Sequence, residues 1–163
     1  MRSRPAVVGV GNLLLSDEGV GVHAARQLAE SESIDADVVD AGTALLDVLE
    51  DLGSRDLLVL LDAVETGGKA GEVASFEISA MASQPGEMLS LHDMGAVESL
   101  RVAALRGVTY DRVVVVGAQP GSLEWGEELS EPLGRAMERM VELTRELIAA
   151  SESACGAPEV SKA

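Results

Sequence analysis

The sequence contains few aromatic residues, few basic residues and one cysteine, and each shortage excludes a class of protein. Aromatic residues make up 2% of the 163 positions, so the chain lacks the stacking platforms that bind nucleobases. Lys and Arg total 12 against 28 Asp and Glu, and the resulting net charge of −16 opposes binding to nucleic acid or to an anionic membrane. The single cysteine, Cys155, excludes an internal disulfide framework and a cysteine-based zinc site.

Long hydrophobic runs are also missing. No stretch approaches the roughly 20 apolar residues of a membrane span. The apolar run that follows Arg4 is interrupted by Gly9 and Gly11, and no small-residue cleavage site of a signal peptide follows it. We therefore expect a cytoplasmic protein without a membrane or nucleic-acid partner. The acidic surface would attract a basic protein partner or serve solubility alone, and charge does not decide between the two.

What the chain does contain is a strand–helix alternation with 47% hydrophobic residues, enough for one packed domain. We expect that domain to span residues 1–150 and residues 151–163 to form a disordered C-terminal tail. Hydrophobic patterns predict strands at 5–10, 37–40, 57–61, 72–78 and 112–116. Helices are expected at 19–30, 44–52, 93–106 and after Ser130, with a loop at 79–89.

This alternation predicts an α/β fold. The expected architecture is a three-layer sandwich with a twisted, mostly parallel sheet of about five strands and helices on both faces. Residues 72–78 alternate between polar and apolar, which suits an edge strand that can run antiparallel. In such sheets, binding sites lie outside the carboxyl ends of the strands, so polar residues there deserve the most weight.

The turn after the first strand resembles a nucleotide-binding loop only superficially. Gly9 and Gly11 fit the first two positions of the dinucleotide fingerprint, but Leu14 occupies the third. Asp17 and Glu18 would then repel a phosphate from the helix start that normally attracts it. Considered alone, these two acids are ordinary first-turn residues that stabilise the helix dipole.

Three residues that follow separate strands form a candidate metal site. Glu18, Asp62 and His92 provide two carboxylates and one imidazole, a donor set suited to a divalent metal such as zinc or nickel. Three protein ligands leave room for water or a substrate group. The alternatives are a turn role for Asp62 and a solvated loop position for His92. His23 points about 140° away from Glu18 on a helix, so we interpret it as a helix-surface residue.

Four motifs occur in order along residues 5–150. They are Gly-x-Gly-Asn-x-Leu-x-x-Asp-Glu-Gly-x-Gly at 9–21, Asp62 at the end of the central strand, Ser-x-His-x-x-Gly at 90–95, and Gln-Pro-x-Ser at 119–122 followed by Leu129 and Ser130. With these motifs, the chain resembles the maturation endopeptidases of nickel–iron (NiFe) hydrogenases. The resemblance implies the same α/β sandwich, of phosphorylase/hydrolase-like type.

The resemblance also implies an activity and a set of site residues. Such peptidases, often classed as aspartic-type, remove a C-terminal extension from the hydrogenase large-subunit precursor after nickel insertion. Glu18, Asp62 and His92 match the family's metal-binding positions and would be its catalytic residues. The supporting or substrate-binding positions implied here are Asn12, Asp17, Asp40, Gly42, Thr43 and Gln119. Ala41 replaces a family glycine beside Asp40.

Two mechanisms and two other functions stay open at this point. A bound divalent metal, zinc or another, could activate water while a carboxylate acts as base. Alternatively, the nickel belongs to the substrate, and the site docks it so that the scissile bond lies beside Asp17 or Asp62. We expect the second mechanism and a monomeric enzyme. The other functions are a non-enzymatic metallochaperone for the immature large subunit and a nucleotide-binding domain.

Overall fold

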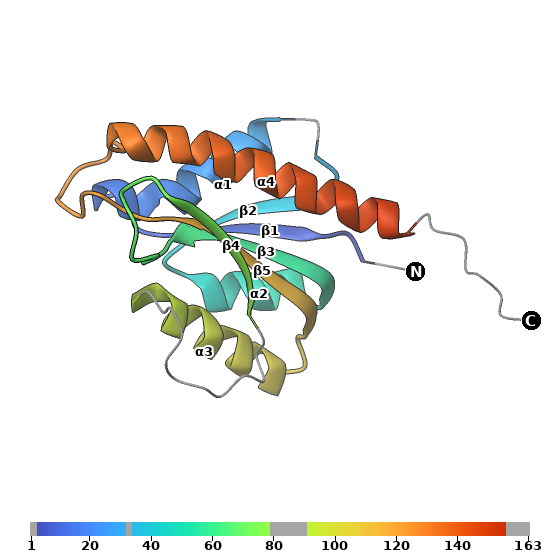
Figure 1. The fold of residues 1–163 in the computed structure, drawn as a ribbon. Helices are drawn as coiled ribbons and strands as arrows, with labels where there is room; N and C mark the ends of the chain where they lie inside the picture. Colours follow the sequence, from blue (N-terminus) through green and yellow to red (C-terminus); the bar gives the residue numbers. More distant parts are fainter. Residues whose placement is uncertain (1–2, 32–33, 79–90, 156–163) are drawn as a thin grey trace, which may run out of the picture.

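The computed structural model describes residues 3–31, 34–78 and 91–155, and the side chains of 91–94 and 154–155 are not described. The predicted loop at 79–89 therefore lies outside the described residues. The sheet has five strands in the order β2-β1-β3-β5-β4 (Figure 1). These strands are β1 (Ala6–Val10), β2 (Asp37–Gly42), β3 (Arg55–Ala63), β4 (Val73–Ile78) and β5 (Tyr110–Ala118). All neighbours pair in parallel except β4, which is an antiparallel edge strand as predicted.

Helices cover both faces of this sheet and complete the predicted three-layer sandwich (Figure 1). The α1 and α4 helices pack together on one face, and α2 and α3 pack together on the other. Their bounds are α1 (Val20–Glu30), α2 (Leu45–Leu52), α3 (Leu91–Leu105) and α4 (Glu131–Cys155), with a short 3₁₀ turn η1 (Ser16–Gly19) before α1.

The strands divide the hydrophobic core into two halves by simple alternation. Val7, Val59 and Val114 face α1 and α4, where they meet Leu28 and Met140. The residues next to them along each strand face the other way and pack against α2 and α3. Because both faces are covered, β1, β3 and β5 are almost continuously apolar, which is the pattern that predicted them.

Two helix boundaries differ from the prediction. The α3 helix begins at Leu91, so His92 lies in its first turn and not in a loop. Asp93 was expected to cap this helix from outside, but an acid is equally favourable inside a first turn. At the other end of the chain, α4 continues to Cys155, into the segment predicted as a disordered tail. Ile148 is buried and anchors the last turns of α4, and the Ser151 hydroxyl donates to the Ile148 carbonyl at 2.7 Å.

Glycines in the 9–21 motif allow α1 to lie directly on the sheet. A Cβ atom on Gly21 would lie 2.0 Å from the carbonyl oxygen of Leu61 and 2.7 Å from that of Val10. A Cβ on Gly11 would lie 2.1 Å from the carbonyl oxygen of Glu18. These glycines therefore bring η1 and α1 against the ends of β1 and β3, and they do not form a phosphate loop.

This close packing predicts that Gly21→Ala destabilises the protein. Backbone atoms would have to separate, and we expect a loss of about 2–4 kcal/mol in the free energy of unfolding, measured with urea. The matched control is Gly134→Ala in α4, where an added Cβ meets open space. That substitution should stabilise by about 0.5–1 kcal/mol because alanine is the better helix former. Equal stability of the two variants would contradict the packing argument.

Candidate active site

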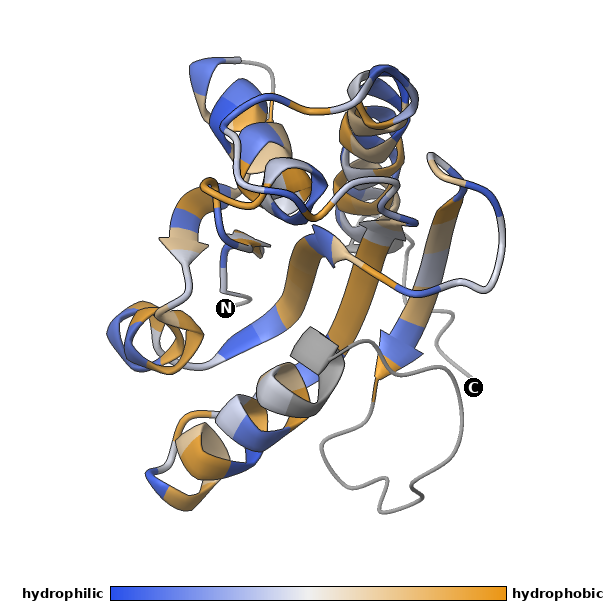
Figure 2. Ribbon diagram, turned by 90° about the vertical axis from the view of Figure 1, so that its left-hand side faces the viewer, coloured by the Kyte–Doolittle hydropathy of each residue, from blue (hydrophilic) through white to orange (hydrophobic). Residues whose placement is uncertain are grey.

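Two buried carboxylates lie where neighbouring parallel strands end. Figure 2 looks onto this carboxyl edge of the sheet. Asp62 is the second-last residue of β3 and is 4% exposed, and its Oδ1 accepts the Ala63 N–H at 2.8 Å. Glu18 lies in η1, which follows β1, and is 8% exposed. Because β1 pairs with β3 and η1 packs against β3, the structure brings both predicted acids to the same edge.

The backbone around Glu18 is held in an unusual conformation. Ser16 has a φ of 49°, a left-handed value that residues other than glycine rarely adopt. Its N–H donates to the Gly126 carbonyl at 2.8 Å, and its hydroxyl donates to the Glu124 carbonyl at 2.7 Å. Such conformations persist where surrounding contacts enforce them and are concentrated at functional sites. The segment after β5 thus fixes the direction in which η1 presents Glu18.

The buried Asp17 side chain connects η1 to the segment after β5. Its Oδ2 accepts the N–H groups of Gly121 and Ser122, both at 2.8 Å, and the Ser130 hydroxyl at 2.7 Å. Its Oδ1 accepts the Ser130 N–H at 2.7 Å. Burial by itself raises the pKa of this carboxyl, but the hydrogen bonds from Ser130, Ser122 and Gly121 outweigh burial and lower it below 3.8.

The role of Asp17 is therefore structural. Both of its oxygens are occupied, and its pKa is shifted in the wrong direction for a base near neutral pH. The sequence-based interpretation of Asp17 as a helix-dipole residue is incomplete, because its partners lie more than 100 residues further along the chain. Ser130 does precede α4 as predicted, but its hydroxyl donates to Asp17.

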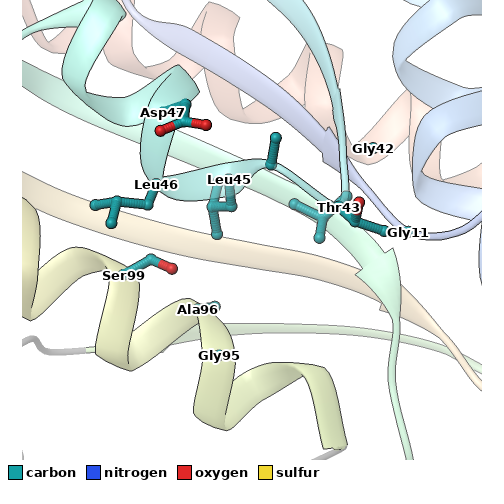
Figure 3. A pocket seen from close by; sticks show the side chains of 11 residues that line it. Gly11, Gly42, Thr43, Leu45, Leu46, Asp47, Gly95, Ala96 and Ser99 are labelled. Carbon is teal, nitrogen blue, oxygen red and sulfur yellow. The ribbon is translucent and has the colours of Figure 1, made fainter.

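A pocket opens between α2 and α3 at this same edge of the sheet, with a volume of about 430 Å³ (Figure 3). Its walls come from the ends of β1 and β2, the start of α2 and the first turns of α3. The lining residues are Val10, Gly11, Gly42, Thr43, Ala44, Leu45, Leu46, Asp47, Gly95, Ala96 and Ser99. Two predicted supporting residues, Gly42 and Thr43, therefore face a cavity large enough for a few side chains of a peptide.

The other predicted supporting residues shape the backbone around this edge. The Asn12 side chain accepts the Leu14 N–H at 2.9 Å and forms a tight turn. Gln119 is buried and accepts the Thr66 N–H at 2.7 Å, which connects the end of β5 to the segment after β3. Asp40 accepts the Gly42 N–H at 3.0 Å and pairs with Arg26 at 2.9 Å.

Of the three predicted metal ligands, the structure describes the side chains of Glu18 and Asp62 only. The backbone of His92 lies one helical turn before Ala96, a residue of the pocket wall, but its side chain is not described. Among the side chains that are described, no group of three His, Cys, Asp or Glu residues could hold a metal ion. Glu18 and Asp62 supply two hard oxygen donors, which fit a divalent cation, and a third ligand would have to come from outside this set.

Sequence reasoning missed the α3 side of the pocket and the Asp40 counter-ion. Gly95, Ala96 and Ser99 have the spacing of residues that share one face of a helix. Nothing in the sequence indicates which other helix that face of α3 packs beside. Arg26 carries no motif, and only the structure shows that it faces Asp40. A short polar residue on an otherwise apolar helix face, such as Ser99, is the only sequence signal that could have indicated the pocket.

These features define an α/β protein that has two buried carboxylates and a pocket at the carboxyl edge of a mixed sheet. Within the described ranges, none of the helices is both long enough and apolar enough to cross a membrane. A model of the hydrogenase maturation protease family matches residues 22–146, which is more than half of the chain. The chain belongs to that family.

Individual relatives agree with this assignment. The hydrogenase expression/formation protein HupD of Rhodobacter capsulatus is 33% identical over 124 residues, or 74% of this chain, but the match spans only 59% of that relative. The hydrogenase maturating endopeptidase HybD from E. coli has a TM-score of 0.78 at 26% identity, covering 91% of this chain and 94% of HybD. For HybD from Thermococcus kodakarensis, a NiFe hydrogenase maturation protease, the TM-score is 0.74 at 26% identity, and the match covers 90% of this chain and 99% of that protein.

Proposed function

We propose that this protein is an endopeptidase that removes the C-terminal extension of a NiFe hydrogenase large-subunit precursor once nickel has been inserted. The observation that carries the proposal is the pair of buried carboxylates, Glu18 and Asp62, at the sheet edge in a chain of this family. The adjoining pocket would hold residues of the precursor next to the scissile bond.

The nickel in this proposal belongs to the substrate. Glu18 and Asp62, with His92 from α3, would recognise the nickel-loaded precursor and position its tail. Two buried carboxylates at the same edge of the sheet would favour a cation, which would offset the cost of burying charge there. Recognition of this kind would make insertion of nickel the condition for cleavage.

Asp62 is the acid that we assign to the hydrolytic step. Asp17 is excluded as the base because four hydrogen bonds occupy its oxygens. Asp62, whose Oδ1 accepts the Ala63 N–H at the end of β3, would accept a proton from the attacking water. Water oxygen then bonds to the scissile carbonyl carbon, the C–N bond breaks, and the proton passes to the leaving amine.

The experiment compares nickel-loaded and nickel-free precursor as substrates for enzyme stripped of metal. We expect cleavage of the loaded precursor alone, seen as a shift to higher electrophoretic mobility. Cleavage that requires added metal and ignores the state of the precursor would overturn substrate-nickel recognition. Stable binding without any change in precursor size would instead identify a metallochaperone.

A further inference from the structure

Three large apolar side chains remain exposed near the candidate active site. Trp125, the only tryptophan in the chain, is 81% exposed, Leu123 is 55% exposed and Leu14 is 51% exposed. We call these three residues the docking patch. They contrast with β1 and β3, whose apolar residues are all buried. Exposed large apolar groups gathered in one region are typical of a protein-binding surface.

The docking patch lies on two segments that form one unit. Leu14 precedes η1, and Leu123 and Trp125 lie in the segment between β5 and α4, at the left of Figure 1. The Gly126 N–H donates to the Leu14 carbonyl at 2.9 Å, and Leu15 and Gly126 form an isolated parallel bridge. The patch is therefore continuous with η1, the turn that carries Glu18.

Asp17 holds this surface in place before any partner binds. Its contacts to Gly121, Ser122 and Ser130 anchor both ends of the segment that carries Trp125. A tryptophan on a fixed backbone loses little conformational entropy when a partner covers it. Tryptophan is also the residue most enriched among those that dominate binding energy at interfaces.

The charges around the patch indicate the chemistry of the partner. Glu124, Glu127 and Glu128 are all exposed, and residues 119–130 include no Lys or Arg. A partner surface with an apolar centre and a basic rim would complement this arrangement. The net charge of −16 would also disfavour pairing of two copies of this chain.

We propose that the docking patch binds the folded body of the hydrogenase large-subunit precursor, on an apolar surface with a basic rim beside its cleavage segment. This inference rests on the proposed function. The patch recognises the body of the precursor, whereas Glu18, Asp62 and the pocket engage the nickel and the tail. Specificity for one hydrogenase over another would then reside in the segment between β5 and α4.

The test is the kinetics of precursor cleavage by Trp125→Ala. We expect KM for the precursor to rise at least tenfold with kcat within twofold of the wild type, because the patch acts in binding only. Trp125→Phe, which keeps an aromatic ring, should raise KM less than threefold. The matched control is Leu105→Ala, since Leu105 is 88% exposed at the far end of α3 and should leave KM unchanged.

Each outcome separates this inference from the proposed function. Wild-type cleavage with an unchanged KM for Trp125→Ala would overturn the docking patch and leave the endopeptidase intact. If the wild type does not cleave, the proposed function fails, and binding of immobilised precursor by the wild type and Trp125→Ala still tests the patch. A wild-type dimer that Trp125→Ala converts to a monomer in sedimentation would assign the patch to a second copy and overturn the proposal.

Discussion

Asp62→Asn is expected to lower the rate of precursor cleavage by about 10²–10⁴-fold while leaving the fold intact. Asparagine keeps an oxygen that can accept the Ala63 N–H, so the end of β3 retains its hydrogen bond. It cannot carry the negative charge that accepts a proton from water. Single-turnover cleavage with saturating enzyme measures the loss, and the urea unfolding midpoint reports on the fold.

The matched control for this variant is Asp111→Asn. Asp111 is an exposed residue near the start of β5, at the opposite edge of the sheet from Asp62, and its neutralisation should leave cleavage within twofold of wild type. Glu18→Gln and His92→Ala should lose activity like Asp62→Asn if these residues act as one site. Normal processing by Asp62→Asn would remove Asp62 from the mechanism.

The second large effect is on stability, for Asp17→Asn. In either orientation, the new amide places an NH₂ group against at least one N–H donor of Gly121, Ser122 or Ser130. A buried donor left without an acceptor costs about 1–3 kcal/mol, and the charge that strengthened the remaining bonds is lost as well. We expect the free energy of unfolding to fall by about 3–5 kcal/mol, measured with urea at neutral pH.

The pH dependence of stability identifies the same residue. Burial alone would raise the pKa of Asp17, but the hydrogen bonds from Ser130, Ser122 and Gly121 together lower the native pKa below the ordinary value of an aspartate. Its stabilisation is therefore complete above the unfolded pKa and is lost as the pH falls through the lower native value. The difference in the free energy of unfolding between wild type and Asp17→Asn, measured with urea at a series of pH values, should therefore shrink as the pH falls through the native pKa of Asp17.

The control for stability is Asp51→Asn. Asp51 is exposed on α2, and its neutralisation should change stability by no more than about 0.5 kcal/mol at any pH. A loss smaller than about 1 kcal/mol in Asp17→Asn would show that its hydrogen bonds do not clamp the two segments together.

The sheet was predictable because its signal is local. Runs such as 57–61 and 113–116 are apolar at every position, which only strands covered on both faces require. The observed β3 and β5 are longer than these runs because their charged ends, including Asp62, continue the parallel pairing. The placement of Asp62 at the end of a central strand followed directly from the position of that run.

The role of Asp17 and the shape of the pocket could not be predicted, because both depend on contacts distant in sequence. Nothing near Asp17 indicates that Ser130 and Gly121 will surround it. The pocket depends on α2 packing beside α3, and amphipathic helices do not specify their neighbours. Glu18, Asp62 and His92 were proposed from their donor types and their positions after strands, and they match the family's metal positions. Their role as one metal site stays a prediction.

The proposed function requires that this chain cuts a NiFe hydrogenase large-subunit precursor near its C-terminus. The most direct measurement is the intact mass of nickel-loaded precursor after incubation with wild-type protein and, in parallel, with Asp62→Asn. We predict one new mass for the wild type, lower than the precursor by a short C-terminal peptide, and the unchanged precursor mass for Asp62→Asn. An unchanged mass with the wild type would contradict the proposed endopeptidase, and the same loss with both proteins would contradict the role of Asp62.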